Sequence, residues 1–200
     1  MTVTRFGAAF ATSMLALQLA GCGINAIPTD EERARAQWSE VLNQYQRRTD
    51  LIPNLVETVK GYAAQEREVL TQVIEARAKA TQIKVDASTI TDPEAFKRFQ
   101  EAQAQLSGVL GRLLAVSERY PDLKSNQNFL ALQAQLEGTE NRVAVARRDY
   151  IEAVRVYNTE LKTFPGVIWA SILYRNNKPM ETFTITEEQM RVPKVEFNKS

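Results

Sequence analysis

A narrow stripe of mostly apolar residues between Asn128 and Phe164 constrains the fold more than any other feature of the chain. Its members follow one another at steps of three or four residues, which is the spacing of one face of a long helix. No proline interrupts the segment, and Gly138 is its one weak helix former. Such a helix extends roughly 55 Å at about 1.5 Å per residue, so it can bury its stripe only against other helices. The stripe consists of Phe129, Leu132, Leu136, Thr139, Val143, Ala146, Tyr150, Ala153 or Val154, Tyr157, Leu161 and Phe164.

A second stripe lies earlier in the chain and crosses Pro53 without losing register. Its members are Trp38, Val41, Tyr45, Arg48, Ile52, Leu55, Val59, Tyr62, Glu66, Val69 and Val73. Two interpretations fit. Asp50 begins a new helix with Pro53 in its first turn, or one helix continues through Pro53 with a kink, which the unbroken register favours. The favoured interpretation of Arg48 and Glu66 is that their charges reach solvent at the edge of the stripe, and a functional charge site is the alternative.

A third stripe follows residues 85–91, a β-branched and polar stretch that we expect to form a loop. Asp92 or Thr91 caps the helix, with Pro93 in its first turn, and Glu94 can complete a capping box with Thr91. The stripe is Phe96, Phe99, Gln103, Leu106, Leu110, Leu113 and Tyr120. After a stop at residues 120–122, Ser125 or Asn126 begins the long helix. Together the stripes predict an all-α bundle of three to four long helices over residues 30–166.

The N-terminus is predicted to be an export signal, residues 1–21. Arg5 gives it a positive start, and an uncharged, largely apolar run of about 14 residues follows, which is shorter than the roughly 20 that span a bilayer. The run ends in Leu-Ala-Gly-Cys, which resembles a bacterial lipoprotein cleavage box. We therefore expect Cys22 to be lipidated and residues 22–29 to form a tether, with Thr29 or Asp30 capping the first helix.

Composition excludes several classes of function. The chain has no His and a single Cys, so an internal disulfide, a cysteine cluster for zinc and a bundle metal site with His ligands are all excluded. Of the 25 basic residues only Arg5 precedes Cys22, and the rest of the chain is balanced by 24 acidic residues. Nucleic-acid binding normally needs a basic surface, so we expect no nucleic-acid partner.

The last part of the chain, residues 167–200, is predicted to be a C-terminal extension. Residues 167–174 are apolar but too short to cross a membrane, so we expect them to pack on the end of the bundle or to lie in a membrane interface. From Arg175 the pattern becomes extended. This tail is either a partner-binding peptide or a loosely ordered terminus.

Two segments are similar to the signature of the LemA family. One runs from Arg47 to Ala63 (RRTDLIPNLVETVKGYA), and the other from Leu136 to Tyr150 (LEGTENRVAVARRDY), followed by Tyr157-Asn158 and Phe164-Pro165-Gly166. The resemblance extends over about residues 38–166, and residues 192–197 are similar to family tails.

The resemblance implies an antiparallel helical bundle displayed on the outer face of a bacterial membrane. It also implies a link to envelope maintenance, with an envelope protein partner such as a membrane protease or a TPM-domain protein. It does not imply an activity, because the molecular function of the family is poorly defined, and we expect no cofactor. Many family members carry an uncleaved transmembrane helix at the N-terminus, whereas this chain has the lipoprotein-type box at Cys22.

Polar residues beside the first two stripes form the candidate site. They are Arg47, Arg48, Asp50, Asn54, Glu57, Glu137, Glu140, Asn141, Arg142, Arg147 and Arg148. Glu140 and Arg147 are seven residues apart and therefore share a helix face. The favoured interpretation is a polar network between helices that fixes their register, and the alternative is a binding surface.

These features predict a membrane-anchored envelope lipoprotein whose bundle acts as a non-catalytic interaction or scaffold module. A purely structural envelope protein is the alternative. An enzyme based on the carboxylates of Glu137 and Glu140 is disfavoured, because acidic pairs at this spacing are common on solvated helix faces. The sequence also contains no Gly-rich phosphate loop and no nucleophile motif.

Overall fold

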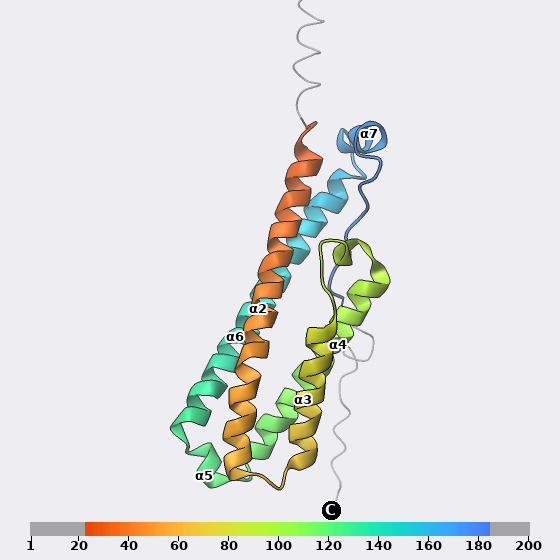
Figure 1. The fold of residues 1–200 in the computed structure, drawn as a ribbon. Helices are drawn as coiled ribbons and strands as arrows, with labels where there is room; N and C mark the ends of the chain where they lie inside the picture. The colour runs from red at the N-terminus through yellow and green to blue at the C-terminus, as the bar shows by residue number, and fades with distance from the viewer. Residues whose placement is uncertain (1–22, 185–200) are drawn as a thin grey trace, which may run out of the picture.

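The computed structural model describes residues 23–184, which form a bundle of four long helices (Figure 1). The long helices are α2 (Ala26–Tyr62), α3 (Arg67–Gln82), α4 (Pro93–Ser117) and α6 (Gln127–Glu160). Three short elements accompany them, the 3-10 turn η1 (Thr89–Thr91), α5 (Pro121–Lys124) and α7 (Gly166–Ile172). The expected export signal, Cys22 and the tail beyond Thr184 lie outside the described residues.

Successive long helices run in opposite directions. In Figure 1 α2 descends, α3 returns part of the way, α4 descends again and α6 rises to the end at which α2 began. The longest interface joins α2 to α6, and α3 packs mainly on α4. This arrangement confirms the predicted all-α antiparallel bundle.

Helix α6 buries the predicted stripe from Phe129 to Tyr157 except Leu132, which is partly buried. Its start is fixed by Asn126, whose Oδ1 accepts a hydrogen bond from the backbone N–H of Phe129 at 3.0 Å. The helix ends at Glu160, so the predicted continuation of the stripe to Phe164 is wrong, and the Phe164 side chain is 80% exposed. Pro165 keeps Phe164 out of the helix, since a proline disfavours helical geometry in the residue before it.

Helix α2 runs unbroken through Pro53, which confirms the favoured single helix and excludes a new helix starting at Asp50. Pro53 has no N–H to donate to the carbonyl oxygen of Thr49, four residues earlier. Arg77 of α3 supplies a donor in its place, because its Nε lies 3.2 Å from that oxygen. A contact between helices therefore satisfies the carbonyl that the proline leaves free.

The second stripe does not continue as one helix to Val73. The chain turns at residues 63–66 and starts α3 at Arg67. Ala63, Leu70 and Val73 are all buried in one core, so a hairpin brings both parts of the stripe to the same interior. Glu66 lies in this turn and not at the edge of a continuing stripe. Its carboxylate accepts hydrogen bonds from Tyr120 Oη at 2.7 Å and from Arg119 Nη2 at 3.1 Å.

The start of α2 also differs from the prediction. The helix begins at Ala26, so residues 26–29 are helical rather than part of a tether, and neither Thr29 nor Asp30 caps it. Ile27 is fully buried, and this burial accounts for the earlier start. Pro28 is tolerated because the first N–H groups of a helix have no partner within it.

The connection between α3 and α4 matches the predicted loop and contains η1. Asp92 rather than Thr91 caps α4, since its Oδ1 accepts hydrogen bonds from the backbone N–H groups of Glu94 and Ala95, both at 3.0 Å.

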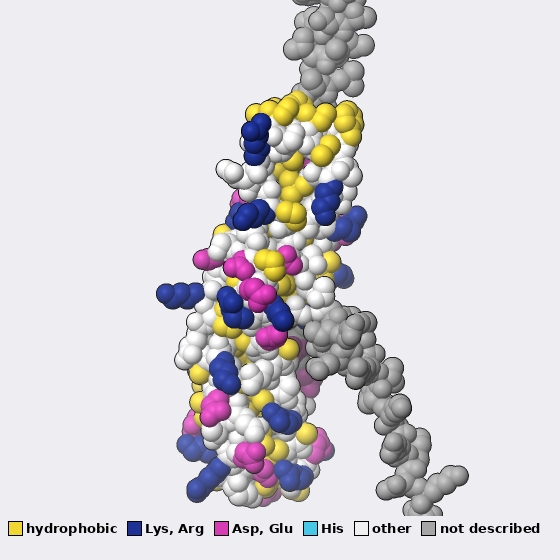
Figure 2. Space-filling model, turned by 90° about the vertical axis from the view of Figure 1, so that its right-hand side faces the viewer, with side chains coloured by type: hydrophobic (Ala, Val, Ile, Leu, Met, Phe, Trp, Pro, Cys, Tyr) yellow, Lys and Arg dark blue, Asp and Glu magenta, His cyan; other side chains and the backbone are white. Residues whose placement is uncertain are grey.

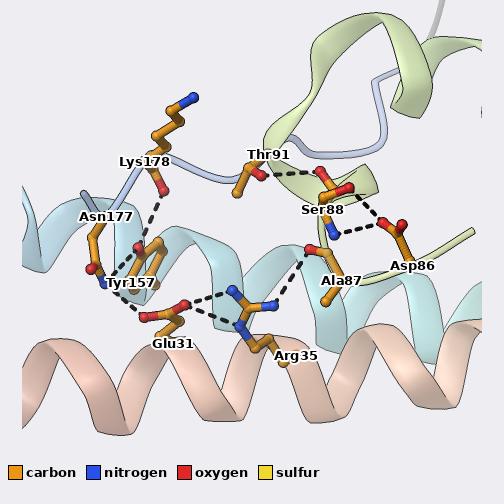
Figure 3. Close-up of polar contacts among 9 residues, drawn as sticks. All are labelled: Glu31, Arg35, Asp86, Ala87, Ser88, Thr91, Tyr157, Asn177 and Lys178. Atoms are coloured by element: carbon orange, nitrogen blue, oxygen red, sulfur yellow. Dashed lines mark hydrogen bonds and ion pairs between the residues drawn. The ribbon is translucent and has the colours of Figure 1, made fainter.

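After a turn at residues 173–176, residues 177–184 run back along the bundle in extended form, so the alternative of a loosely ordered terminus is wrong for this part of the tail. Met180 and Phe183 are buried in the core. Asn158 of α6 bonds both to the N–H and to the carbonyl oxygen of Met180 at 2.9 Å, and the N–H of Glu181 donates to Ile90 O at 2.7 Å. Figure 3 shows the same segment tied at Asn177 and Lys178 to α2 and α6.

The interior divides into two halves along the bundle. The aromatic half lies toward α7 and contains Trp38, Tyr45, Phe96, Phe99, Tyr150, Tyr157 and Phe183 among its buried members. The aliphatic half lies toward α5 and contains Ile52, Leu55, Val59, Leu70, Val73, Leu106, Leu110, Leu113 and Leu136 among its members. The candidate site lies between the two halves.

Candidate functional site

Arg48 is the central residue of the candidate site. It is one helical turn beyond Tyr45 on α2, and only 1% of its side chain is exposed. The expectation that its charge reaches solvent is therefore wrong. The guanidinium carbon lies 4.9 Å from the centre of the Tyr45 ring. This side chain separates the aromatic half from the aliphatic half.

The guanidinium of Arg48 bonds to two other helices. Its Nη1 donates to Ser107 Oγ of α4 at 2.7 Å and to Glu140 Oε1 of α6 at 3.0 Å. Its Nη2 donates to the side-chain oxygen of Gln103 and, at 3.4 Å, to the Gln103 carbonyl oxygen. One buried cation thus links α2, α4 and α6.

The charges of this pair are unevenly solvated. A buried cation is costly unless a counter-charge and hydrogen bonds compensate for the lost water. Arg48 has both, but the Glu140 side chain is 41% exposed, so solvent weakens the attraction. The Nε of Arg48 is buried and has no hydrogen-bond partner among the described residues. Protein contacts therefore compensate only in part for the hydration that the Arg48 guanidinium loses.

Arg147 lies above this pair on α6, and its guanidinium carbon is 4.4 Å from the centre of the Phe183 ring. Burial raises the pKa of Tyr45, and the positive charges of Arg147 and Arg48 oppose that rise. Burial also raises the pKa of Tyr150, and the negative charge of Glu181 adds to the effect. Both phenols are therefore neutral at physiological pH.

A groove of about 720 Å³ opens over Arg48. Its walls are α4, α6 and residues 181–184, and Gln100 Nε2 of α4 donates to Thr184 O at 2.7 Å on one side. A second hollow of about 510 Å³ shares Ser107 and Glu140 with it and extends toward Glu137 and Asn141. We refer to the two together as the α4–α6 groove.

Five of the predicted site residues line the α4–α6 groove. They are Arg48, Glu137, Glu140, Asn141 and Arg147. Glu140 and Arg147 lie on one face, as their spacing predicts. The groove contains both cations and carboxylates and presents no single sign of charge.

The other six predicted residues are exposed and do not line the groove. They are Arg47, Asp50, Asn54, Glu57, Arg142 and Arg148. Several make short-range contacts: Asp50 accepts a hydrogen bond from Gln46 at 2.7 Å, Glu57 pairs with Lys60 at 3.6 Å, and Arg148 pairs with Asp149 at 3.0 Å. Arg142 reaches Thr139 at 3.0 Å and Gln44 at 3.3 Å, so it alone of these residues bonds across to α2.

Sequence reasoning missed the α4 side of the site. Gln103 and Ser107 both bond to Arg48. Gln103 is buried, and it is the one polar amide within an otherwise apolar stripe. This position in the stripe could have identified Gln103 as a partner of a buried polar group. Ser107 carried no signal, because it lies one residue away from the stripe.

The groove offers little for metal or acid–base chemistry. Within residues 23–184, no group of three or more metal-binding side chains is close enough to hold an ion. Glu140 is bonded to Arg48, and Glu137 accepts a hydrogen bond from Gln133 at 3.0 Å. The two carboxylates therefore have separate partners.

Within residues 23–184, no helix is both long and apolar enough to cross a membrane.

Comparison with known proteins gives one family and several relatives. The model of the LemA family matches residues 37–197. The chain is 26% identical over 157 residues to magnetosome protein MamQ 2 of Paramagnetospirillum magneticum, a match that covers 70% of this chain and 58% of that protein. It is 24% identical over 140 residues to protein LemA of Metamycoplasma hominis, covering 70% of this chain and 60% of that protein. The chain thus spans less than two thirds of the length of these relatives.

Proposed function

The chain belongs to the LemA family, and on this basis we propose that it is a bacterial envelope lipoprotein whose helical bundle binds a protein partner without catalysis. The lipid on Cys22 attaches it to a membrane at the outer or periplasmic face. The α4–α6 groove is its binding surface, and an envelope protein is its partner.

The observation that carries the proposal is the position of Arg48 under the groove. Its bonds to Ser107, Gln103 and Glu140 hold α2, α4 and α6 in one register. Preorganised polar groups lower the cost of binding because fewer side chains must be ordered when the partner arrives. A fixed polar floor beneath a groove open to solvent suits recognition of another protein.

Crosslinking in native envelopes tests the groove. A photoreactive residue replaces Ala104, which is exposed and lines the groove, and the matched control replaces Val145, which is exposed on α6 and does not line it. We expect a defined crosslinked protein from position 104 and none from position 145. Equal crosslinking from both positions would contradict a specific groove.

The double variant Glu140→Ala with Arg147→Ala distinguishes binding from a purely structural role. Either role predicts a loss of roughly 1–3 kcal/mol of unfolding free energy, because the change removes the counter-charge of the buried Arg48. A binding role also predicts loss of the crosslink from position 104 in folded protein, whereas a purely structural network predicts that the crosslink is kept. If the variant keeps both stability and crosslink, neither role survives. Turnover of a small substrate by the purified protein would overturn the non-catalytic proposal.

The lipid anchor has its own test. Wild-type protein should incorporate acyl label, and Cys22→Ser should lose the label or stay uncleaved. Equal labelling of the two proteins would exclude Cys22 as the acylated residue.

A further inference from the structure

An exposed apolar surface covers the end of the bundle that carries α7. Ten large hydrophobic side chains are exposed in residues 23–184, and five of them lie between Phe164 and Leu173. We call these five the apolar end; they are Phe164, Val167, Ile168, Ile172 and Leu173. Figure 2 shows hydrophobic side chains gathered over this end, whereas charged side chains are interspersed over the opposite one.

The described chain begins beside this surface. Tyr174 Oη donates to Ile24 O at 3.0 Å, which holds the start of the chain against the segment after α7. Gly23 has a φ of +112°, and a Cβ at this position would lie 3.4 Å from Pro165 Cγ. Cys22, the proposed site of acylation, is the residue before Gly23. The point of membrane attachment and the apolar end are thus neighbours.

The segment that carries the apolar end has charges of one sign, and the carboxylate of Glu160, the residue before that segment, lies beside Gly166. Between Leu161 and Met180 the chain has three cations, Lys162, Arg175 and Lys178, and no Asp or Glu. The nearby carboxylate of Glu31 on α2 is engaged by Arg35 at 2.7 Å and by Asn177 at 2.6 Å (Figure 3). Exposed apolar side chains bordered by cations are typical of surfaces that lie on anionic lipid.

The apolar end is also firmly fixed to the bundle. Trp169 and Tyr174 pack their rings against the aromatic half. Tyr157 Oη donates to Lys178 O at 3.2 Å, and Asn177 bridges α2 and α6 (Figure 3). A rigid apolar surface loses little conformational entropy when it is buried, which favours docking as a unit.

We propose that the apolar end lies in the headgroup region of an anionic lipid bilayer and forms a second membrane contact beside the acyl anchor. This inference rests on the membrane attachment in the proposed function. The inference has a consequence for orientation. An acyl anchor alone lets the bundle axis take many angles to the bilayer, whereas a docked end holds the axis away from the membrane plane. Arg48 lies roughly 33 Å from Ala26 along α2, at about 1.5 Å per residue. In this orientation the groove over Arg48 is held away from the bilayer and is exposed to protein partners.

Two tryptophan reporters test the inference in the full-length acylated protein. Ile172→Trp places a reporter on the apolar end, and Leu130→Trp places the control on α6 near α5; the original side chains are 56% and 47% exposed. Each protein is reconstituted into vesicles of phosphatidylglycerol and phosphatidylcholine that carry bromine near the glycerol end of the acyl chains. We expect the added emission of Ile172→Trp to be largely quenched and that of Leu130→Trp to be unchanged.

Charge substitutions sharpen the result. Ile168→Glu, added to Ile172→Trp, should abolish most of the quenching, and the matched control Ile74→Glu should not. Changing Lys162, Arg175 and Lys178 together to Gln should weaken quenching in anionic vesicles. Quenching that is insensitive to Ile168→Glu would overturn the inference.

Flotation with the vesicles separates failure of this inference from failure of the anchor. Protein that floats while both reporters stay unquenched, or are quenched equally, overturns the docked end and leaves the anchor intact. Protein that does not float overturns membrane attachment and the inference with it. An Ile172→Trp reporter that becomes buried without vesicles identifies a second copy of the chain as the occupant and also overturns the inference.

Discussion

The aromatic and aliphatic halves of the bundle bury their interiors in different ways. In the aliphatic half all four long helices contribute, and Phe129 is the one aromatic residue among the buried members of its core. In the aromatic half α3 contributes no fully buried side chain, and Met180 and Phe183 of the C-terminal segment pack there instead. Large rings reach farther from the backbone than Leu or Val, so they can fill an interior where one helix is missing.

This difference shows that a bundle of unequal helices can bury an interior at both of its ends. Trp38 contacts four rings, with centroid distances of 5.2 Å to Phe99, 5.3 Å to Tyr150, 5.7 Å to Phe96 and 6.2 Å to Phe183. The aromatic half therefore depends on a few large side chains, whereas the aliphatic half distributes its packing over many small ones.

The largest effect is expected for Trp38→Ala. Removing a large buried ring that contacts four others should cost about 3–5 kcal/mol of unfolding free energy. Chemical denaturation measures the loss. Hydrogen exchange should show early opening at the N–H of Glu181, because the segment that carries it packs on the same rings. A cost below about 1 kcal/mol would contradict the dependence of this half on its rings.

A smaller effect is expected for Leu106→Ala in the aliphatic half. The cost should be about 2–3 kcal/mol, at the low end for a buried leucine, since many small neighbours can relax into the cavity. Protection of the Glu181 N–H should stay as in the wild type. If its protection falls as much as in Trp38→Ala, the two halves open together and the contrast is lost.

The boundary between the halves is tested by Gln103→Leu. This change removes an acceptor of the buried Arg48 and should cost roughly 1–3 kcal/mol. Adding Arg48→Met should recover most of that cost, because an apolar pair avoids burying an unpaired cation. Urea unfolding of the two variants measures both effects. A double variant less stable than Gln103→Leu would mean that Arg48 itself is a net source of stability.

Alkaline pH should act mainly on the aromatic half. Burial raises the pKa of Tyr45, Tyr150 and Tyr157 above the usual 10.0, so above that pH the unfolded chain releases protons that the folded chain keeps. The stability that these tyrosines contribute is therefore fully present below pH 10. It falls as pH rises further, by about 1.4 kcal/mol per pH unit for each such tyrosine. Denaturation at increasing pH measures the slope. Tyr150→Phe should reduce it.

The smallest effect is expected for Glu152→Ala, which serves as the surface control. Glu152 is exposed and pairs with Arg155 one turn along α6 at 2.5 Å. An exposed pair of this kind contributes little because solvent screens it. Its midpoint of unfolding should match the wild type, and a clear loss would show that the assignment of buried and exposed faces on α6 is wrong.

The local patterns of the sequence were enough to predict the fold class and the starts of α4 and α6. Helix α6 follows from a stripe without proline, Asn126 and Asp92 act as caps, and the fold class follows from stripes that must bury one another. The turn at residues 63–66 was not predictable, since the stripe stays in register across it. The register of a stripe identifies a face but does not say whether the chain folds back.

The candidate site was predicted only in part, for a related reason. The resemblance to the LemA family selected eleven polar residues, and five line the α4–α6 groove. Which five do so depends on helices that are distant in the chain, because Arg48 meets Ser107 and Glu140 across separations of 59 and 92 residues. No local pattern encodes such a meeting.

The sequence by itself determined that this chain forms long amphipathic helices, where α4 and α6 begin, and which faces are buried. These properties depend on spacing, capping and proline, which act within a few residues. Only the tertiary structure decided that α2 ends in a hairpin and that Arg48 is buried between two unlike halves. It alone also decided that α7 places an apolar surface beside the start of the described chain. These outcomes depend on which side chains meet across helices, and packing sets that through the free energy of the whole interior.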